Sequence, residues 1–567
     1  MQEINIKPKD PNWFSSVESP QKVSDPLMVN WDDTADLIVV GLGGAGIAAA
    51  NEALDKSCTV IGIDKTTGGG ATARSGGIFY AGGGTSFQKD AGVKDTPNNM
   101  FNYLIQEVGD VVKESTLRNF CDTSVENTEW LVKNGVKFNS AYYKKKTSYP
   151  DAGHFLYHSD NSLVPKYMEN AEPAPRGHRG YEEGPFKPVG VGGTIYHPLK
   201  KSAIKKGLKI YPQTEARGLI VNSNNDVVGI KVLSLPGGKQ AEKHKKLMRK
   251  GEAFQMLLPQ NYPGASFFQA IGSFYINRAK KIEAKYREIK LFRAKKGVCI
   301  AAGGFIFNRE MVKHYAPKYF SGMPLGTVND DGSGIRLGQS VGGRADLMDR
   351  VTAWRMINPP TAFAQGIVVN KSGNRFTNEM VYGATLGDAM CEKQNGKSYL
   401  ILDEVLFKKA KAEAKTALPF QRDPALIMMY FNARKKTQLS KLSKIYDIDE
   451  SNLKKSIEKY NASARSNKPC EYGKAAKDVH ELKAPFYIMD ISIDSRLSPL
   501  PCITLGGLVL NEATGEVLNK DNNEIKGLYA AGRSAIGICS NIYVSGLSIA
   551  DCIFSGRRVG SHIGGNK

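Results

Sequence analysis

Two uncharged hydroxyl side chains stand directly ahead of the last predicted helix of the chain. The segment SNIYVSGLS, residues 540–548, places Tyr543 and Ser545 in a glycine-containing turn. A phenol has an ordinary pKa of about 10, so it can donate a hydrogen bond to an oxyanion or relay a proton. A serine hydroxyl is a poor base alone, but it acts in a relay with a tyrosine or a water. The pair is a candidate for proton chemistry.

A second cluster lies near the N-terminus, in DLIVVGLGGAGIAAANEALDKSCTVIGIDK. A buried-strand run leads into Gly41, Gly43 and Gly46 with the spacing GxGxxG, and a helix, a second strand and Asp64 follow. Gly41 allows the tight turn, Gly43 lets the backbone approach a pyrophosphate, and Gly46 permits close helix–strand packing. The helix N-terminus attracts the diphosphate, and Asp64 can bind a ribose 2′-hydroxyl. This context predicts a dinucleotide site that also includes Gly44, Ala45 and Lys65.

The pattern alone does not separate FAD from NAD, but the next stretch does so by resemblance. TTGGGATARSGGIFYAGGGTS, residues 66–86, resembles the flavin-contacting loop of the fumarate reductase and 3-ketosteroid dehydrogenase flavoproteins. The resemblance implies a bound FAD, and the loop contains no His, so the FAD is expected to be non-covalent. The matching residues are Gly69, Gly70, Ala71, Thr72, Ser75, Gly76 and Gly77.

The same resemblance implies further FAD contacts along the chain. The backbone near Ala216 would meet the adenine, and a returning strand would bring Ala302 and Gly303 to the cofactor. The last helix would point its N-terminal dipole at the flavin pyrimidine end. The remaining expected contacts are Asp331, Gly532, Arg533, Leu547 and Ser548.

The segment 540–548 also bears on the reaction. Fumarate reductases hold two carboxylates with Arg and His, whereas this segment has no cation, which disfavours a dicarboxylate substrate. The C-terminal segment, PAPRGHR and NRFTNEMVYG resemble the 3-ketosteroid Δ4-(5α)-dehydrogenase group. That resemblance implies a catalytic set of Tyr382, Tyr543 and Ser545.

The implied activity is desaturation of a lipophilic, 3-ketosteroid-like ketone at C4–C5. A proton would leave the carbon α to the carbonyl, and a hydride would pass to flavin N5. The alternative is an ene-reductase that acts on a neutral enone or another unsaturated compound at the same site. The direction depends on an electron acceptor or donor that the sequence does not identify.

These elements predict an α/β fold. It consists of a Rossmann-like doubly wound FAD-binding domain with an inserted α+β capping domain for the substrate. The expected boundaries are an irregular N-terminal extension at 1–34, the FAD-binding domain at 35–344 and 495–567, and the capping domain at 345–494. Residues 136–200 are expected to be rich in loops, and residues 214–232 to form two strands around a tight turn.

Composition and charge narrow the class of protein. The 567 residues are 41% hydrophobic, no CxxC pair occurs among eight cysteines, and neither a metal site nor a disulfide framework is expected. The N-terminus has no apolar signal segment, and no run is long enough to cross a membrane. These features indicate a cytoplasmic enzyme, with contact to the inner face of the membrane as a further expectation.

That expectation comes from the net charge of +21, about half of which lies in residues 236–295. This segment mixes Lys and Arg clusters with Phe, Tyr and Leu at helical spacing. A basic amphipathic helix is suited to a membrane surface, but a pair of helices packed on the enzyme or on a partner subunit fits as well. Nothing in it matches a fold that binds nucleic acid.

Overall fold

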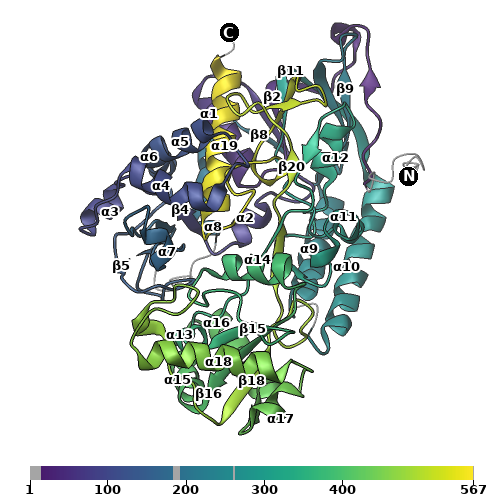
Figure 1. The fold of residues 1–567 in the computed structure, drawn as a ribbon. Coiled ribbons are helices and arrows are strands. Elements are labelled where there is room, and N and C mark those ends of the chain that lie inside the picture. Colours follow the sequence, from purple (N-terminus) through teal and green to yellow (C-terminus); the bar gives the residue numbers. More distant parts are fainter. Residues whose placement is uncertain (1–14, 183–191, 259–261, 566–567) are drawn as a thin grey trace.

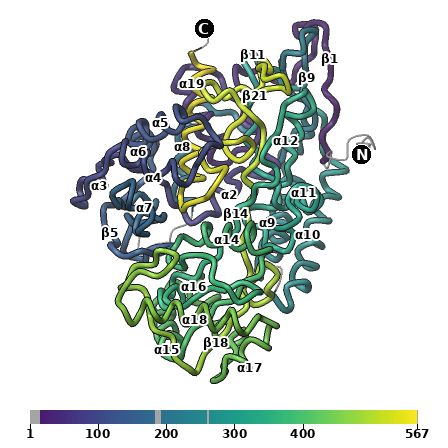
Figure 2. Tube along the Cα trace, viewed as in Figure 1, coloured from purple at the N-terminus to yellow at the C-terminus, as the bar shows by residue number. Residues whose placement is uncertain are grey.

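The computed structural model describes residues 15–182, 192–258 and 262–565. Figure 1 shows an upper body, which contains the purple and yellow segments, and a lower body made of the green segments. The tube in Figure 2 shows that the chain passes into the lower body and then returns to the upper one. Residues 1–14 of the predicted extension and 259–261 of the predicted insertion lie outside the described residues.

The largest sheet has a parallel centre with an antiparallel edge. Its parallel centre has the order β22 (Glu524–Ala530), β11 (Glu288–Ile300), β2 (Asp33–Val40), β3 (Val60–Ile63) and β8 (Lys209–Tyr211). Its other strands are β9 (Thr214–Val221), β10 (Val227–Ser234), β21 (Glu516–Leu518) and β1 (Gln21–Lys22). Residues 37–40 are all buried because both faces of the sheet are covered, which explains their continuous apolar run. The two predicted strands within residues 214–232 are confirmed as β9 and β10.

The last helix packs directly against the first one. α19 (Leu547–Gly565) lies beside α1 (Gly44–Asp55), as Figure 1 shows in yellow and purple. A Cβ atom on Gly556 would stand 2.4 Å from the carbonyl oxygen of Ala45, and one on Gly560 would stand 2.6 Å from that of Ala49. Glycine at these two positions therefore lets the helix backbones touch. This contact joins the N-terminal glycine loop to residues 540–548 from the other end of the chain.

The upper body also contains a small sheet that takes three of its four strands from residues 136–200, which were expected to be rich in loops. Its strands have the order β4 (Ile78–Tyr80), β7 (Gly177–Arg179), β6 (Leu156–Tyr157) and β5 (Tyr142–Tyr143). The helices of this part are α2 (Gly70–Arg74), α3 (Ser86–Asp90), α4 (Pro97–Val108), α5 (Glu114–Asp122), α6 (Ser124–Lys133), α7 (Pro165–Met168) and α8 (Gly193–Lys205). Two further short helices, α11 (Arg309–Tyr315) and α12 (Ser333–Gln339), follow β11.

The lower body has a sheet and a hydrophobic core of its own. The antiparallel sheet has the order β15 (Ile367–Asn370), β16 (Ser398–Asp403), β18 (Phe486–Asp490) and β17 (Arg434–Lys436). Its core runs from Ile357 to Ile491. The helices of this body are α13 (Thr361–Ala364), α14 (Gly383–Lys393), α15 (Glu404–Thr416), α16 (Pro419–Ile427), α17 (Leu439–Ser443) and α18 (Glu450–Arg465).

The chain segments that join the two bodies pair with each other. β13 (Ala345–Asp346) pairs with β20 (Gly507–Leu508), while β14 (Val351–Ala353) and β12 (Met323–Pro324) flank β19 (Pro501–Thr504). Residues 345–353, where the second domain was expected to begin, are thus bonded to strands of the returning chain.

The basic segment 236–295 forms two packed helices and part of a strand. α9 (Lys239–Gln255) and α10 (Ala265–Tyr286) run antiparallel, since His244 bonds to Glu283 and Gly251 meets Gly272. Arg287 reaches Glu215 of β9 at 2.7 Å, which ties the helix pair to the large sheet. Residues 288–295 belong to β11, so the inserted helices end earlier than expected.

Within residues 15–182, 192–258 and 262–565, no helix is long and apolar enough to cross a membrane. The same residues contain no group of three or more His, Cys, Asp or Glu side chains that could hold a metal ion. All eight cysteines are free and buried.

Candidate active site

A cavity of about 640 Å³ runs from the N-terminal glycine loop to residues of the lower body. We call its two parts the glycine end and the tyrosine end. Gly41, Gly43 and Gly44 line the first, and Tyr543 and Ser545 line the second. A smaller extension of about 60 Å³, lined by Lys65, Ala216 and Ala302 among others, shares several residues with the glycine end.

The three fingerprint glycines at the glycine end have different surroundings. A Cβ on Gly46 would lie 2.0 Å from the carbonyl oxygen of Gly41, and one on Gly41 would lie 2.7 Å from that of Ala301. A Cβ on Gly43 would meet no protein atom within 4 Å. Gly41 and Gly46 therefore serve packing within the chain, whereas Gly43 leaves free space in the cavity for the close approach of a ligand.

The second glycine loop lies against the first. Gly69, with a φ of 107°, begins α2, and the hydroxyl of Thr72 accepts a hydrogen bond from the Gly44 N–H at 3.1 Å. The Ser75 hydroxyl closes the loop by donating to the Thr72 carbonyl at 2.8 Å. The predicted residues of this loop that line the cavity are Gly69, Gly70, Ala71, Thr72, Ser75 and Gly76.

The acid at the end of β3 faces the cavity while it also supports the loop. The Asp64 carboxylate accepts hydrogen bonds from the N–H groups of Leu42 at 3.0 Å and Thr66 at 2.8 Å. Lys65 beside it pairs with Asp331 at 2.7 Å and with Glu215 at 3.4 Å.

Glu215 precedes the predicted adenine contact Ala216 and is almost completely buried. Burial alone would raise the pKa of Glu215, but Lys65, Arg287 and Arg217 hold it at about 2. The Glu215 carboxylate is therefore charged at neutral pH and forms ion pairs with Lys65, Arg217 and Arg287.

A buried ion pair lies beside the middle of the cavity. Arg533 donates to Asp330 at 3.0 Å, and Asp330 in turn accepts the N–H of Thr327 at 2.8 Å. Burial lowers the pKa of Arg533, but the charge of Asp330 outweighs this and raises it above its ordinary value. The Nη1 atom of Arg533 is buried and has no hydrogen-bond partner among the described residues. A ligand oxygen in the cavity would supply one.

At the tyrosine end, side chains from three segments meet. Tyr382 from the start of α14 lies 6.4 Å, ring centre to ring centre, from Tyr543. The Ser545 hydroxyl accepts a hydrogen bond from the Tyr157 phenol of β6 at 3.1 Å. Ser159 fixes the backbone of Ser545 twice, by donating its hydroxyl to the Ser545 carbonyl at 3.0 Å and by accepting the Ser545 N–H at 3.1 Å.

Burial determines the protonation of these phenols. It raises the pKa of Tyr543 to about 12 and places the pKa values of Tyr382 and Tyr157 well above 10. The tyrosines are therefore protonated donors at neutral pH. The Tyr382 hydroxyl is buried near Ser545, which lowers its pKa slightly against the effect of burial, but among the described residues it makes no hydrogen bond of good geometry.

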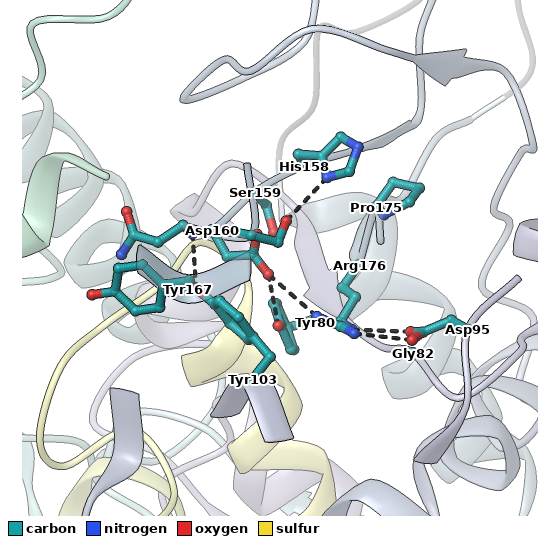
Figure 3. Close-up of polar contacts among 12 residues, drawn as sticks. Tyr80, Gly82, Asp95, Tyr103, His158, Ser159, Asp160, Tyr167, Pro175 and Arg176 are labelled. Atoms are coloured by element: carbon teal, nitrogen blue, oxygen red, sulfur yellow. Dashed lines mark hydrogen bonds and ion pairs between the residues drawn. The ribbon is translucent and has the colours of Figure 1, made fainter. Parts of the chain in front are cut away.

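A buried polar network supports this end of the cavity, and Figure 3 shows its centre. Asp160 accepts the phenol of Tyr80 at 2.8 Å, and Arg176, 3.9 Å from Asp160, pairs with Asp95 at 2.9 Å. Asp160, Arg176 and Asp95 have buried side chains. Because Ser159 and Asp160 are neighbours in the chain, the network anchors the strand end that binds Ser545.

Five of the residues predicted from the sequence do not line the cavity. Gly46 and Leu547 are packing residues, Asp331 pairs with Lys65, and Tyr382 packs behind Tyr543 against Trp354. The fifth is Gly77. All other predicted residues line the cavity or its extension. Those not yet mentioned as lining residues are Ala45, Gly303, Gly532, Arg533 and Ser548.

The structure adds lining residues that the sequence did not indicate. Asp330 lines the cavity beside Arg533, in place of the neighbouring Asp331 that the sequence favoured. Tyr149, Trp354 and Phe420 give the tyrosine end aromatic walls, and Tyr157 supports Ser545 from behind. The sequence shows the pair Asp330-Asp331, so it could have indicated Asp330. The aromatic residues belong to irregular or short elements and to no motif, so no sequence signal marks them.

Comparison with known proteins gives the family. A model of the FAD binding domain family matches residues 36–546. The 3-oxo-5-alpha-steroid 4-dehydrogenase of Comamonas testosteroni is 36% identical over 516 residues, which cover 89% of this chain and 93% of that protein. The fumarate reductase (cytochrome) of Shewanella frigidimarina is 23% identical, with coverage of 93% and 76%.

A solved structure gives the same indication. The 3-ketosteroid-delta4-(5alpha)-dehydrogenase of Rhodococcus jostii RHA1, in complex with 4-androstene-3,17-dione, has a TM-score of 0.79 and 27% identity to this chain. The match covers 96% of this chain and 99% of that one.

The cavity fits the FAD that the family binds. Its volume of about 640 Å³ is in the range of ligand sites, the space over Gly43 is open, and the α1 N-terminus can receive a diphosphate. The partnerless Nη1 of Arg533 is a donor for a cofactor oxygen. The predicted resemblance is confirmed: the chain belongs to the FAD-binding family that includes the fumarate reductases and 3-ketosteroid dehydrogenases, and it is an FAD-dependent oxidoreductase acting on CH–CH bonds.

Proposed function

We propose that this enzyme desaturates a 3-ketosteroid-like ketone at C4–C5, with the tyrosine end of the cavity as the substrate site. The proposal rests on the pairing of every cation of the described cavity wall with a carboxylate. Among the described residues, each cation that lines the cavity or its extension is paired with a carboxylate: Arg74 with Glu252, Arg533 with Asp330, and Lys65 with Asp331. No free cation is left for a substrate carboxylate, so a neutral ketone fits better than a dicarboxylate.

The side chains at the tyrosine end suit the oxygen of a ketone. Tyr543 is a protonated phenol that lines the cavity and can donate a hydrogen bond to a carbonyl oxygen, and Tyr382 is a second protonated phenol that packs against it. Such donors stabilise the negative charge that develops on that oxygen when the adjacent carbon, C4, loses its proton. The aromatic walls, Tyr149, Trp354 and Phe420, favour a flat lipophilic molecule.

The proton from C4 enters the group of hydroxyls formed by Ser545, Tyr382 and Tyr543, and a hydroxyl of this group passes a proton on to water, so that the group ends neutral. The Ser545 oxygen accepts a hydrogen bond from the Tyr157 phenol, and this bond can stabilise negative charge on the serine oxygen during proton transfer. When bound, FAD supplies at its N5 atom the acceptor for the hydride that leaves C5. The protein residues thus handle the proton and orient the ketone.

The two bodies take separate roles in this proposal. Residues 35–344 and 495–567 form a Rossmann-like, doubly wound FAD-binding domain, and the FAD lies along the two glycine loops. Residues 345–494 form a capping domain that contributes Tyr382 and Phe420 to the substrate site.

The second candidate is an ene-reductase that acts on a neutral enone at the same site. Hydrogen-bond donors that stabilise the enolate-like oxygen serve the reaction in both directions, so the buried phenols favour both candidates equally. The direction then depends on the electron partner, which the proposal leaves open.

Two assays separate these candidates. Purified holoenzyme is mixed with 5α-androstane-3-one compounds and a dye acceptor, and separately with steroid enones and reduced viologen. Faster dye reduction than enone reduction supports the dehydrogenase, and the reverse supports the ene-reductase. Failure of both reactions with FAD bound would refute the proposed substrate class.

We further propose that the enzyme touches a membrane surface through α9 and α10. Four apolar side chains, which we call the apolar tip, are exposed at the C-terminal end of α9 and in the first half of α10: Met256 (41%), Leu257 (55%), Phe267 (65%) and Phe274 (56%). Basic residues are exposed along both helices, and the nearest of them adjoin the tip, since Arg278 stands 5.4 Å from the centre of the Phe274 ring. They are Lys239, Lys243, Lys245, Lys246, Arg249 and Lys250 of α9, and Arg278, Lys280, Lys281 and Lys285 of α10. An apolar tip with a basic collar suits the boundary between acyl chains and anionic headgroups.

The tip is also close to the cavity. Met256 at the end of α9 lines the cavity, as does Glu252 one turn before it. A lipophilic ketone held in a bilayer would therefore have a short path to the tyrosine end.

Vesicle flotation tests this contact. The protein should float with vesicles that contain anionic lipid, and Phe267→Ser/Phe274→Ser and Lys246→Glu/Lys250→Glu should both reduce the bound fraction. The matched control is Leu27→Ser/Met28→Ser, which removes apolar side chains of 72% and 84% exposure at a different place. Equal flotation by all variants would contradict the proposal, and a change of oligomeric state in the Phe variant would assign the tip to a second copy of the chain.

A further inference from the structure

One residue with a buried carboxyl group is linked by hydrogen bonds both to the loop of Tyr543 and Ser545 and, through Asn161, to the backbone of Tyr382. Glu107 stands in the last turn of α4 and is 0% exposed. Its backbone carbonyl accepts the Ile542 N–H at 3.3 Å and the Asn541 side-chain amide at 2.9 Å. Since Tyr543 follows Ile542, this carbonyl fixes the start of the loop that presents Tyr543 and Ser545.

The side chain of Glu107 bonds to Tyr103 of its own helix and to Asn161. Its Oε1 accepts the Tyr103 phenol at 2.6 Å and the Asn161 amide at 2.7 Å. The oxygen of the Asn161 side chain accepts the backbone N–H of Tyr382 at 2.5 Å, and its amide also donates to the Thr385 hydroxyl at 2.8 Å. Asn161 therefore holds the first turn of α14, which carries Tyr382.

Asn161 also belongs to the segment that anchors Ser545. Residues 157–161 follow one another along the chain from β6, and Tyr157 and Ser159 bond to Ser545 as described above. Figure 3 shows the next residue, Asp160, facing Tyr80 and Arg176, with Tyr103 close by. One short buried segment is thus bonded to the catalytic loop on one side and to the start of α14 on the other.

We propose that Glu107 and Asn161 are positioning residues that hold Tyr382 in register with Tyr543 and Ser545. The inference rests on the proposed function, since it assigns a purpose to the spacing of the candidate catalytic tyrosines. The two tyrosines come from different bodies, and no hydrogen bond between their side chains is present among the described residues. The path from Tyr382 N–H through Asn161 and Glu107 to Ile542 N–H is a direct polar connection between the two backbones.

Amide hydrogen exchange tests this connection without a need for turnover. Asn161→Ala leaves the buried N–H of Tyr382 without its acceptor, so exchange should become faster in peptides that cover residues 380–386. The matched control is Asn51→Ala, because Asn51 is equally buried and bonds only to the carbonyls of Ile47 and Leu199. Unchanged exchange at 380–386 in Asn161→Ala would overturn the inference, even if no ketone substrate were found.

Kinetics of the holoenzyme test the catalytic consequence. Asn161→Ala should lower kcat about 10-fold or more with little change in KM, because a small displacement of a catalytic group slows the chemical step more than it weakens binding. In a Tyr382→Phe background the same change should cost less than about 2-fold, since the positioned hydroxyl is already absent. Equal losses in both backgrounds would show that Asn161 acts only on general stability.

Variants at Glu107 complete the test. Glu107→Gln keeps an oxygen that can accept from Tyr103 and Asn161, so it should retain most of the activity, whereas Glu107→Ala should match Asn161→Ala. The backbone carbonyl remains in both, which confines the difference to the side chain. An active Glu107→Ala protein with normal exchange at 380–386 would exclude the positioning role. If the wild type shows no turnover of the ketone while exchange at 380–386 is faster in Asn161→Ala, the proposed substrate is refuted. The positioning role of Asn161 and Glu107 then still holds.

Discussion

The two ends of the cavity are built from different groups. At the glycine end the cavity is formed by backbone, with Gly43 leaving space that a side chain would fill. At the tyrosine end it is formed by side chains, among them Tyr543 and Ser545 of one loop, and Tyr157 and Tyr382 from distant segments pack against that loop only in the folded protein. Ligand binding at the glycine end therefore requires that Gly43 has no side chain, whereas chemistry at the tyrosine end requires exact placement of hydroxyl groups.

This contrast predicts different consequences of substitution at each end. A change at the glycine end should alter folding or cofactor binding in an all-or-none manner, because backbone atoms have nowhere to move. A change at the tyrosine end should leave the FAD bound and affect the rate.

Gly46→Val should have the largest effect. Its Cβ would lie 2.0 Å from the Gly41 carbonyl oxygen, so the α1–β2 packing must break and the protein should lose both stability and FAD. Gly43→Val should fold normally but fail to retain FAD, since its Cβ meets no protein atom. Flavin absorbance after gel filtration and the thermal midpoint of the apoprotein distinguish the two variants. Equal thermal midpoints would contradict the separate roles of the two glycines.

Arg533→Met should have the next largest effect, because it removes one partner of a buried pair. Asp330 would keep a buried charge with no cation, which costs about 3–5 kcal/mol in the free energy of unfolding. Adding Asp330→Asn should recover much of that loss, and urea unfolding of both proteins measures it. If the double variant is as unstable as the single one, the pair does not act as a unit.

Tyr543→Phe should lower turnover of the ketone by about 10²–10³-fold, the cost of removing a donor to a developing oxyanion. Flavin content should stay unchanged, which separates this end of the cavity from the glycine end. Because burial raises the pKa of Tyr543 to about 12, the hydroxyl is protonated at every pH below about 10, and the variant should be equally impaired from pH 6 to 9. Release of flavin would instead indicate a structural role.

The same contrast explains how far the sequence predicted the site. The dinucleotide site and its glycine loops could be predicted because a strand, a glycine loop and a helix are local in the chain, and their spacing follows from backbone geometry. The choice of FAD came from the resemblance of residues 66–86 to known flavoproteins. Tyr543 and Ser545 line the cavity, and they were singled out because they directly precede a helix and match the C-terminal segment of the family, while their catalytic role stays a prediction. The sequence could not give Glu107, since a Glu within an amphipathic helix is normally expected in solvent, and its burial depends on Asn161 and Ile542 from distant segments.

The segment 236–295 shows a second limit. Its charge and its helical periodicity were visible, but its attachment to the sheet by Arg287 and Glu215 was not, because that pair joins residues far apart in sequence. The exposed Phe267 and Phe274 are apolar in any environment, so the sequence could not distinguish packing from membrane contact. The structure shows that the helices pack against each other and also expose an apolar tip.

The smallest expected effect concerns the pH dependence of stability at Glu107. Burial raises the pKa of this carboxyl to about 7, against 4.5 for an ordinary glutamate. Between these values the unfolded chain loses a proton that the native state keeps, so the free energy of unfolding falls as pH rises, and the loss is complete above about pH 7. Glu107→Gln removes this term, so the variant should gain on the wild type by at most about 3 kcal/mol between pH 4 and pH 8.

Urea unfolding of the holoenzyme at a series of pH values measures the difference between the two proteins. Taking that difference cancels the contributions of the other buried groups near this site, such as Lys146, whose pKa burial lowers to about 8. Glu129→Gln is the control, since its exposed side chain carries no burial cost and it should keep the wild-type pH dependence. If Glu107→Gln also keeps that dependence, the carboxyl is ionised in the native state, and the connection between the catalytic loop and α14 carries a negative charge beside the phenols. That charge would oppose an enolate-like oxygen, so the proposed proton transfer requires Glu107 to be neutral when the ketone reacts.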